Sequence, residues 1–70
     1  MTREELRQTA AIAAMQGMIT AVAGSPLILE NWARSAGRDG KSVSELICIY
    51  SVDYADNLIK ALDNEEQRLA

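Results

Sequence analysis

The 70-residue sequence contains no histidine and no phenylalanine, and it has only one cysteine and one proline. A single cysteine excludes an intrachain disulfide. The absence of histidine excludes the common zinc-ligand spacings and the usual general base of nucleophilic catalysis. So short a chain has a marginal core and gains stability from close helix packing, self-association or both. We therefore predict one small domain over residues 1–70 that is not an enzyme and binds no metal or cofactor.

Positive charge is also scarce. The chain carries seven Lys and Arg residues against ten Asp and Glu residues, which gives a formal net charge of −3. Proteins that bind long nucleic acids generally present a basic face, so the composition argues against such a role. The longest apolar stretch, Thr9 to Ile19, is far shorter than the roughly 20 residues of a membrane span, and the first residues are unlike a signal peptide. We expect a cytoplasmic protein with no membrane partner.

Capping signals divide the chain into three helices. Thr2 and Ser42 are each followed three residues later by glutamate, which is the pattern of a capping box. A serine precedes Pro26, as at many helix starts, and Gly24 and Gly37 are expected to end the first two helices. Apolar residues recur three and four apart after each start. The sequence predicts an all-α fold with two long antiparallel helices joined by a short helix and a basic loop. The predicted helices cover about 3–23, 26–36 and 43–67.

Small residues recur along the first predicted helix, from Ala10 to Gly24, at spacings of four, three, four and three. Such a stripe lets a second helix come closer than the usual distance, and that helix is either the third one of this chain or a copy from another subunit. The helix is apolar on its other faces too, which favours a homo-oligomeric helical bundle. A lone tryptophan in the short helix either joins an interface or covers the core. The candidate interface residues are Ala10, Ala14, Met15, Gly17, Met18, Ala21, Val22 and Trp32.

The segment SAGRDGKS, from Ser35 to Ser42, lacks only the first glycine of a phosphate-binding P-loop. A helix rather than a strand precedes it, and the chain has no room for the sheet of a nucleotide-hydrolysing enzyme. It does open a helix, whose N–H groups favour anions, so it is either a solvated cap or an anion site. Two tyrosines four residues apart either stack on a nucleobase or pack in the core. The candidate ligand-binding residues are Arg34, Arg38, Lys41, Ser42, Tyr50 and Tyr54.

The remaining reactive side chains, Cys48, Asp53 and Asp56, are better explained by packing or solvent exposure than by catalysis or metal binding. Cys48 lies in the apolar run L-I-C-I, where a thiol usually serves as a small buried side chain. Asp53 and Asp56 share a helix face, which could hold a metal but more commonly faces solvent or pairs with Lys60. A helix-turn-helix would begin its recognition helix with S-V-S-E-L-I, which has no arginine, asparagine or glutamine to read base edges. The sequence therefore argues against DNA as a partner.

Two stretches of the chain resemble very short phage and prophage reading frames. Ala10–Ile19 is similar to their first helix, which reads A-A-x-A-M-Q-G-L-L, and Ser51–Leu62 is similar to their last helix, A-x-x-Y-A-D-x-L-I-x-x-L. The two stretches cover about a third of the chain. The segment between them departs from the family's brief linker. The resemblance implies an accessory phage product in a bacterial host cytoplasm, and it transfers no functional residue.

Three functions follow from these observations. The first is a non-catalytic counter-defence protein that sequesters a small anionic ligand, such as a cyclic nucleotide signal, between basic side chains of neighbouring copies. The second is a protein–protein inhibitor or adaptor that binds a host defence protein through Trp32 and the acidic last helix. The third is a small DNA-binding regulator. We favour the first.

Overall fold

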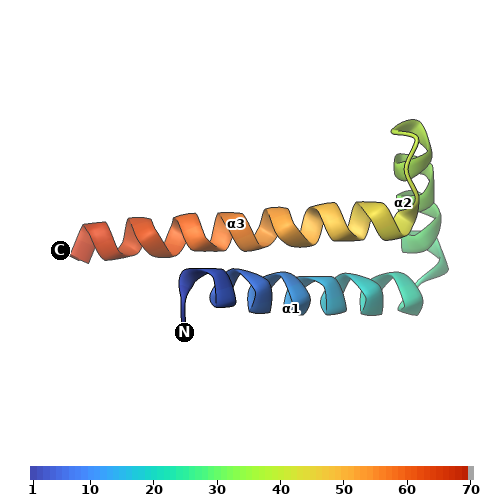
Figure 1. Cartoon of the computed structure of the whole chain (residues 1–70). Helices are drawn as coiled ribbons and strands as arrows, with labels where there is room; N and C mark the ends of the chain where they lie inside the picture. Colours follow the sequence, from blue (N-terminus) through green and yellow to red (C-terminus); the bar gives the residue numbers. More distant parts are fainter. Residues whose placement is uncertain (70) are drawn as a thin grey trace.

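The computed structural model describes residues 1–69, and all regular secondary structure in that range is helical. The helices are α1 (Arg3–Gly24), α2 (Pro26–Arg38) and α3 (Val43–Leu69), as Figure 1 shows. The predicted all-α fold of three helices is confirmed. Each helix extends one or two residues beyond the C-terminal bound expected from the sequence.

Hydrogen-bonding side chains determine where the first two helices begin. The Thr2 hydroxyl oxygen accepts a hydrogen bond from the Glu5 backbone N–H at 3.1 Å, as the capping pattern predicts. The Ser25 hydroxyl oxygen accepts one from the Ile28 N–H at 3.3 Å, and Pro26 occupies the first position of α2. At Ser25 the chain turns sharply, because the directions of α1 and α2 differ by 115°.

The end of α2 depends on a glycine other than the expected one. The helix continues through Gly37 to Arg38, and among residues 1–69 only Gly40 adopts a positive φ, of 69°. The Gly40 N–H donates to the Gly37 carbonyl at 3.2 Å, and the Lys41 N–H donates to the Ala36 carbonyl at 2.8 Å. These bonds form a Schellman motif, in which a left-handed residue lets the chain satisfy the last helical carbonyls. The prediction of Gly37 as the stop is wrong because that glycine keeps a helical conformation.

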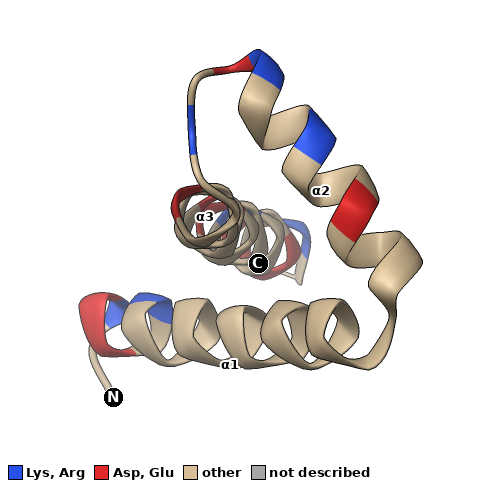
Figure 2. Cartoon of the chain, turned by 90° about the vertical axis from the view of Figure 1, so that its right-hand side faces the viewer, with Lys and Arg blue, Asp and Glu red and all other residues tan. Residues whose placement is uncertain are grey.

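In the view of Figure 1, α3 runs above α1, and α2 crosses the beginning of α3. Arg3 Nη2 lies 2.6 Å from Asp63 Oδ1, so the first turn of α1 lies beside a late turn of α3. In the view of Figure 2, α3 is seen nearly end-on while α1 runs across the picture. The long helices therefore cross obliquely. The molecule is elongated, with dimensions of 45 × 22 × 18 Å.

The buried core is small. It contains four hydrophobic residues, Ala36, Leu46, Ile47 and Ala55, and one polar residue, Ser51. The Ser51 hydroxyl donates a hydrogen bond to the Ile47 carbonyl at 2.7 Å, so this buried polar group is satisfied. The helix α1 contributes no buried residue, and twelve large apolar side chains within residues 1–69 are more than a third exposed. A single copy therefore leaves much of its apolar surface in contact with water.

The hydropathy of α1 is the highest of the three helices, because its charges are confined to its first two turns (Figure 2). No single helix among residues 1–69 has both the length and the apolar composition of a membrane span. The helices α1 and α2 meet that test only as a pair, and the 115° bend lies between them.

Candidate functional site

The basic loop lies between the end of α2 and the first turn of α3. The Ser42 Oγ accepts a hydrogen bond from the Glu45 backbone N–H at 3.1 Å. The Glu45 carboxylate in turn accepts one from the Ser42 N–H at 3.1 Å, which completes the predicted capping box. The chain's own carboxylate therefore lies at the positive end of α3. An anion bound at this loop depends on cationic side chains rather than on the N–H of Ser42.

The three basic side chains near the loop differ in their partners. Arg34 Nη2 donates a hydrogen bond to Glu30 Oε1 at 3.1 Å, one turn earlier in α2. Arg38 and Lys41 are exposed, and neither forms an ion pair within the described residues. Figure 2 shows the basic segments of α2 and of the following loop on the side of the molecule away from α1. Two unpaired cations are thus the strongest feature of this loop.

The two predicted tyrosines of α3 lie in different surroundings. The Tyr50 ring meets the Trp32 ring edge to face, with centroids 5.6 Å apart and ring planes at 83°. They line a shallow hollow of about 200 Å³, whose other lining residues are Asn31, Ser35 and Leu46. Tyr54 is 63 % exposed, and it lies twelve residues after Ser42, roughly 18 Å along the helix axis. One chain therefore does not bring the six predicted ligand-binding residues into a single pocket.

The predicted interface residues fall into two groups. Gly17 and Ala21 are exposed, and a Cβ added at Gly17 would meet no atom within 4 Å. The half-buried group consists of Ala10, Ala14, Met15, Met18, Val22 and Trp32. No described helix of this chain fills the small-residue stripe along its full length.

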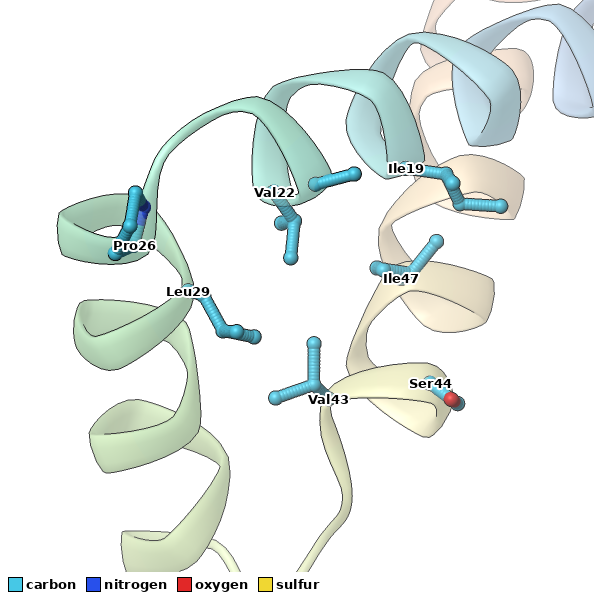
Figure 3. A pocket seen from close by; sticks show the side chains of 8 residues that line it. Ile19, Val22, Pro26, Leu29, Val43, Ser44 and Ile47 are labelled. Atoms are coloured by element: carbon cyan, nitrogen blue, oxygen red, sulfur yellow. The ribbon is translucent and has the colours of Figure 1, made fainter.

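An apolar groove opens where the end of α1 and the starts of α2 and α3 meet (Figure 3). Its volume is about 560 Å³. The side chains of Val22, Leu29 and Val43 come from three different helices and point toward one another across the open space. The other lining residues are Ile19, Ala23, Pro26, Ser44 and Ile47. Sequence reasoning missed this groove, because periodicity assigns residues to a helix face and does not show where three helices leave a gap.

A second apolar hollow, of about 150 Å³, lies further along α1 and α3. It is lined by Ala11, Ile12, Met15, Cys48, Ser51 and Val52. Cys48 is exposed, so the expectation of a buried thiol is wrong. Each residue turns a helix by about 100°, so the residue that follows the buried pair Leu46 and Ile47 faces the flank of α3 rather than its core.

Charged side chains join α1 to the second half of α3. Arg7 Nε donates a hydrogen bond to Asp56 Oδ1 at 2.6 Å. The partner of Asp56 is therefore on the other long helix, whereas the sequence suggested pairing with Lys60. This hydrogen bond and the arginine charge hold the pKa of Asp56 below its ordinary value. The same hydrogen bond and the negative charge of Asp56 raise the pKa of Arg7. Among residues 1–69 no three His, Cys, Asp or Glu side chains form a group that could hold a metal ion, so Asp53 has no such partners.

No protein-family model, no curated protein and no solved structure matches this chain. The resemblance of Ala10–Ile19 and Ser51–Leu62 to phage reading frames therefore stays a prediction. The residues and their geometry alone bear on what the molecule does.

Proposed function

We propose that this chain is a non-catalytic counter-defence protein of phage type that sequesters a small anionic ligand, such as a cyclic nucleotide signal, in the bacterial cytoplasm. In this proposal it acts as a homo-oligomeric bundle of antiparallel helices. The observation that carries the proposal is the pair of exposed cations, Arg38 and Lys41, which form no ion pair within residues 1–69. Asp39 lies between them, so the segment Arg38–Lys41 carries a net charge of +1 in a chain whose net charge is −3. Such a local positive charge attracts anions.

The size of the core supports the oligomer. Four buried hydrophobic residues, two of them alanines, are few for an independent domain. Chains of this length without a disulfide or a metal commonly gain stability from association. A bundle of copies would cover apolar side chains that one copy exposes.

The number of free cations supports a site shared between copies. A cyclic dinucleotide carries two phosphate groups, and one chain offers only two unpaired cations at its loop. Arginine binds phosphate through paired hydrogen bonds, whereas lysine contributes a mobile point charge. In a symmetric oligomer each copy contributes its own Arg38 and Lys41, so a ligand shared between copies meets more than two cations. The exposed ring of Tyr54, which is far from its own loop, is free to stack on a base held by a neighbouring copy.

Isothermal titration calorimetry against a panel of cyclic di- and trinucleotides tests the proposal, with ATP as an unrelated anion. We expect heat from one class of cyclic nucleotide. The double variant Arg38→Gln/Lys41→Gln should raise Kd about 100-fold or more, because it removes two charge-assisted hydrogen bonds that each contribute roughly 1.5–3 kcal/mol. The matched control is Arg68→Gln, which removes an arginine near the other end of α3 and should leave Kd unchanged. Absence of heat with every member of the panel contradicts the proposal.

A second candidate function is inhibition of a host defence protein, and one feature of α3 favours it. Tyr54, Leu58 and Leu62 are exposed and lie four residues apart, which is the spacing of a helix that binds in a partner's groove. The same half of the helix is acidic and suits a basic partner surface. Co-purification from transformed cells, combined with an activity assay of the captured defence enzyme, tests this role. A chain that purifies alone and leaves defence enzymes active contradicts it.

A further inference from the structure

One flank of the paired helices α1 and α3 is apolar over residues 11–23 of α1 and residues 43–52 of α3. We name it the Cys48 face and define it by Ile12, Met15, Ile19, Cys48 and Val52. Ile12 and Ile19 are 52 % and 48 % exposed, and their seven-residue spacing puts them on one side of α1. Cys48 and Val52 are exposed and lie one turn apart on α3. Ile12, Met15, Cys48 and Val52 line the hollow of about 150 Å³, and Ile19 lines the groove of about 560 Å³.

The lining of the hollow and of the groove carries no charge. None of the fourteen residues that line the hollow and the groove is Asp, Glu, Lys or Arg. In a two-fold contact the same patch of both subunits meets, so a patch with charge of one sign would repel itself. An uncharged apolar patch has no such penalty. It also offers no charge that would select a charged partner, which favours a second copy as the occupant.

The exposed area of one chain matches what a dimer needs. The accessible surface is 5081 Å², whereas a folded monomer of 7.6 kDa exposes about 4,300 Å². The surplus of about 800 Å² equals the area that each partner contributes to an interface of standard size. The surplus belongs to the whole chain, and the exposed side chains of Ile12, Ile19 and Val52 on the Cys48 face contribute to it.

We propose that a second copy of this chain covers the Cys48 face through a two-fold contact. The proposal rests on the homo-oligomer of the proposed function and assigns its interface. The interface is centred on Ile12, Cys48 and Val52, whereas the small-residue stripe that contains Gly17 lies on another side of α1. Cys48 is at the centre of this interface, so the reactivity of its thiol measures whether a second copy covers the face, and no engineered cysteine is needed.

The test combines one charge substitution with the reactivity of the native thiol. Ile12→Glu places a charge in the contact and should weaken dimerisation about 30-fold or more in sedimentation equilibrium. Ala13→Glu is the matched control, because it adds the same charge at an exposed position of the same helix that is turned about 100° away from Ile12, and it should leave the mass unchanged. At concentrations that favour the dimer, maleimide should modify Cys48 roughly tenfold more slowly in the wild-type chain than in Ile12→Glu. Far-ultraviolet circular dichroism verifies that both variants remain helical.

The outcomes separate this inference from the proposed function. If Ile12→Glu stays associated and Cys48 reacts rapidly in the assembled wild-type chain, the interface lies elsewhere and the inference is overturned, while the homo-oligomer stands. If the wild-type chain is a monomer at every concentration, both fail. If Ile12→Glu becomes monomeric but binds the anion as tightly as before, the inference is supported and the shared ligand site of the proposed function is wrong.

Discussion

Replacement of Leu46 by alanine is the sharpest test of where the core lies. Leu46 is only 4 % exposed and is the bulkiest side chain of the buried set, together with Ile47. Truncation of a buried leucine costs about 2–5 kcal/mol, depending on how far its neighbours relax. Here Leu46 itself lines the hollow beside Trp32 and Tyr50, so its neighbours have room to move inward. We therefore expect a loss of about 2–3 kcal/mol, at the lower end of that range.

Such a loss is large for this chain. A domain of this size has a free energy of unfolding of about 3.5–10 kcal/mol. Because one kcal/mol corresponds to roughly 4–8 °C in Tm for domains of 60–100 residues, Leu46→Ala should lower Tm by about 10–20 °C. Urea unfolding followed by circular dichroism measures the free energy, and a thermal scan measures Tm.

The matched control is the same substitution at an exposed leucine. Leu27 in α2 is 66 % exposed and lies outside the Cys48 face, so Leu27→Ala should change the free energy of unfolding by less than about 0.5 kcal/mol. If Leu27→Ala destabilises the chain as much as Leu46→Ala does, the packing of α2 against α3 is not as described. Equal and negligible effects of both substitutions would show that the chain has no core at this position.

Two further predictions concern the hydrogen bonds of α3. The lowered pKa of Asp56 means that its pairing with Arg7 stabilises the fold above the ordinary pKa of 3.8 and that this contribution is lost as pH falls through the folded-state value. The Tm difference between wild type and Asp56→Asn should therefore be small but constant from pH 7 to about pH 5 and vanish in stronger acid. Ser42→Ala removes the cap of α3 and should cost about 1 kcal/mol in urea unfolding, while Ser44→Ala, within the same helix, should cost less than half of that. A larger loss at Ser44 would contradict the capping role.

The sequence predicted the helices well because their starts are encoded locally. Thr2, Ser25 and Ser42 each bond to an N–H three residues later, and such bonds need no tertiary contact. The end of α2 was harder to predict, since Gly37 and Gly40 are equivalent as residue types. Which of them takes a positive φ depends on where the chain must turn to enter α3.

The candidate site was less predictable from the sequence. The pairing of Asp56 with Arg7 spans 49 positions and depends on how α1 lies against α3. The exposure of Cys48 depends on the same packing, because an apolar run on a helix presents some of its members to the flanks. The separation of Tyr54 from the basic loop, in contrast, follows from the helical rise alone. It was available from the sequence once α3 was recognised as continuous.

Size-exclusion chromatography with multi-angle light scattering tests the central claim most directly, because the claim is that one copy does not cover its own apolar surface. The mass of one chain is 7.6 kDa. We predict a measured mass of at least twice this value across the accessible concentration range, falling only on strong dilution. A mass that stays at 7.6 kDa in the most concentrated samples would contradict the account.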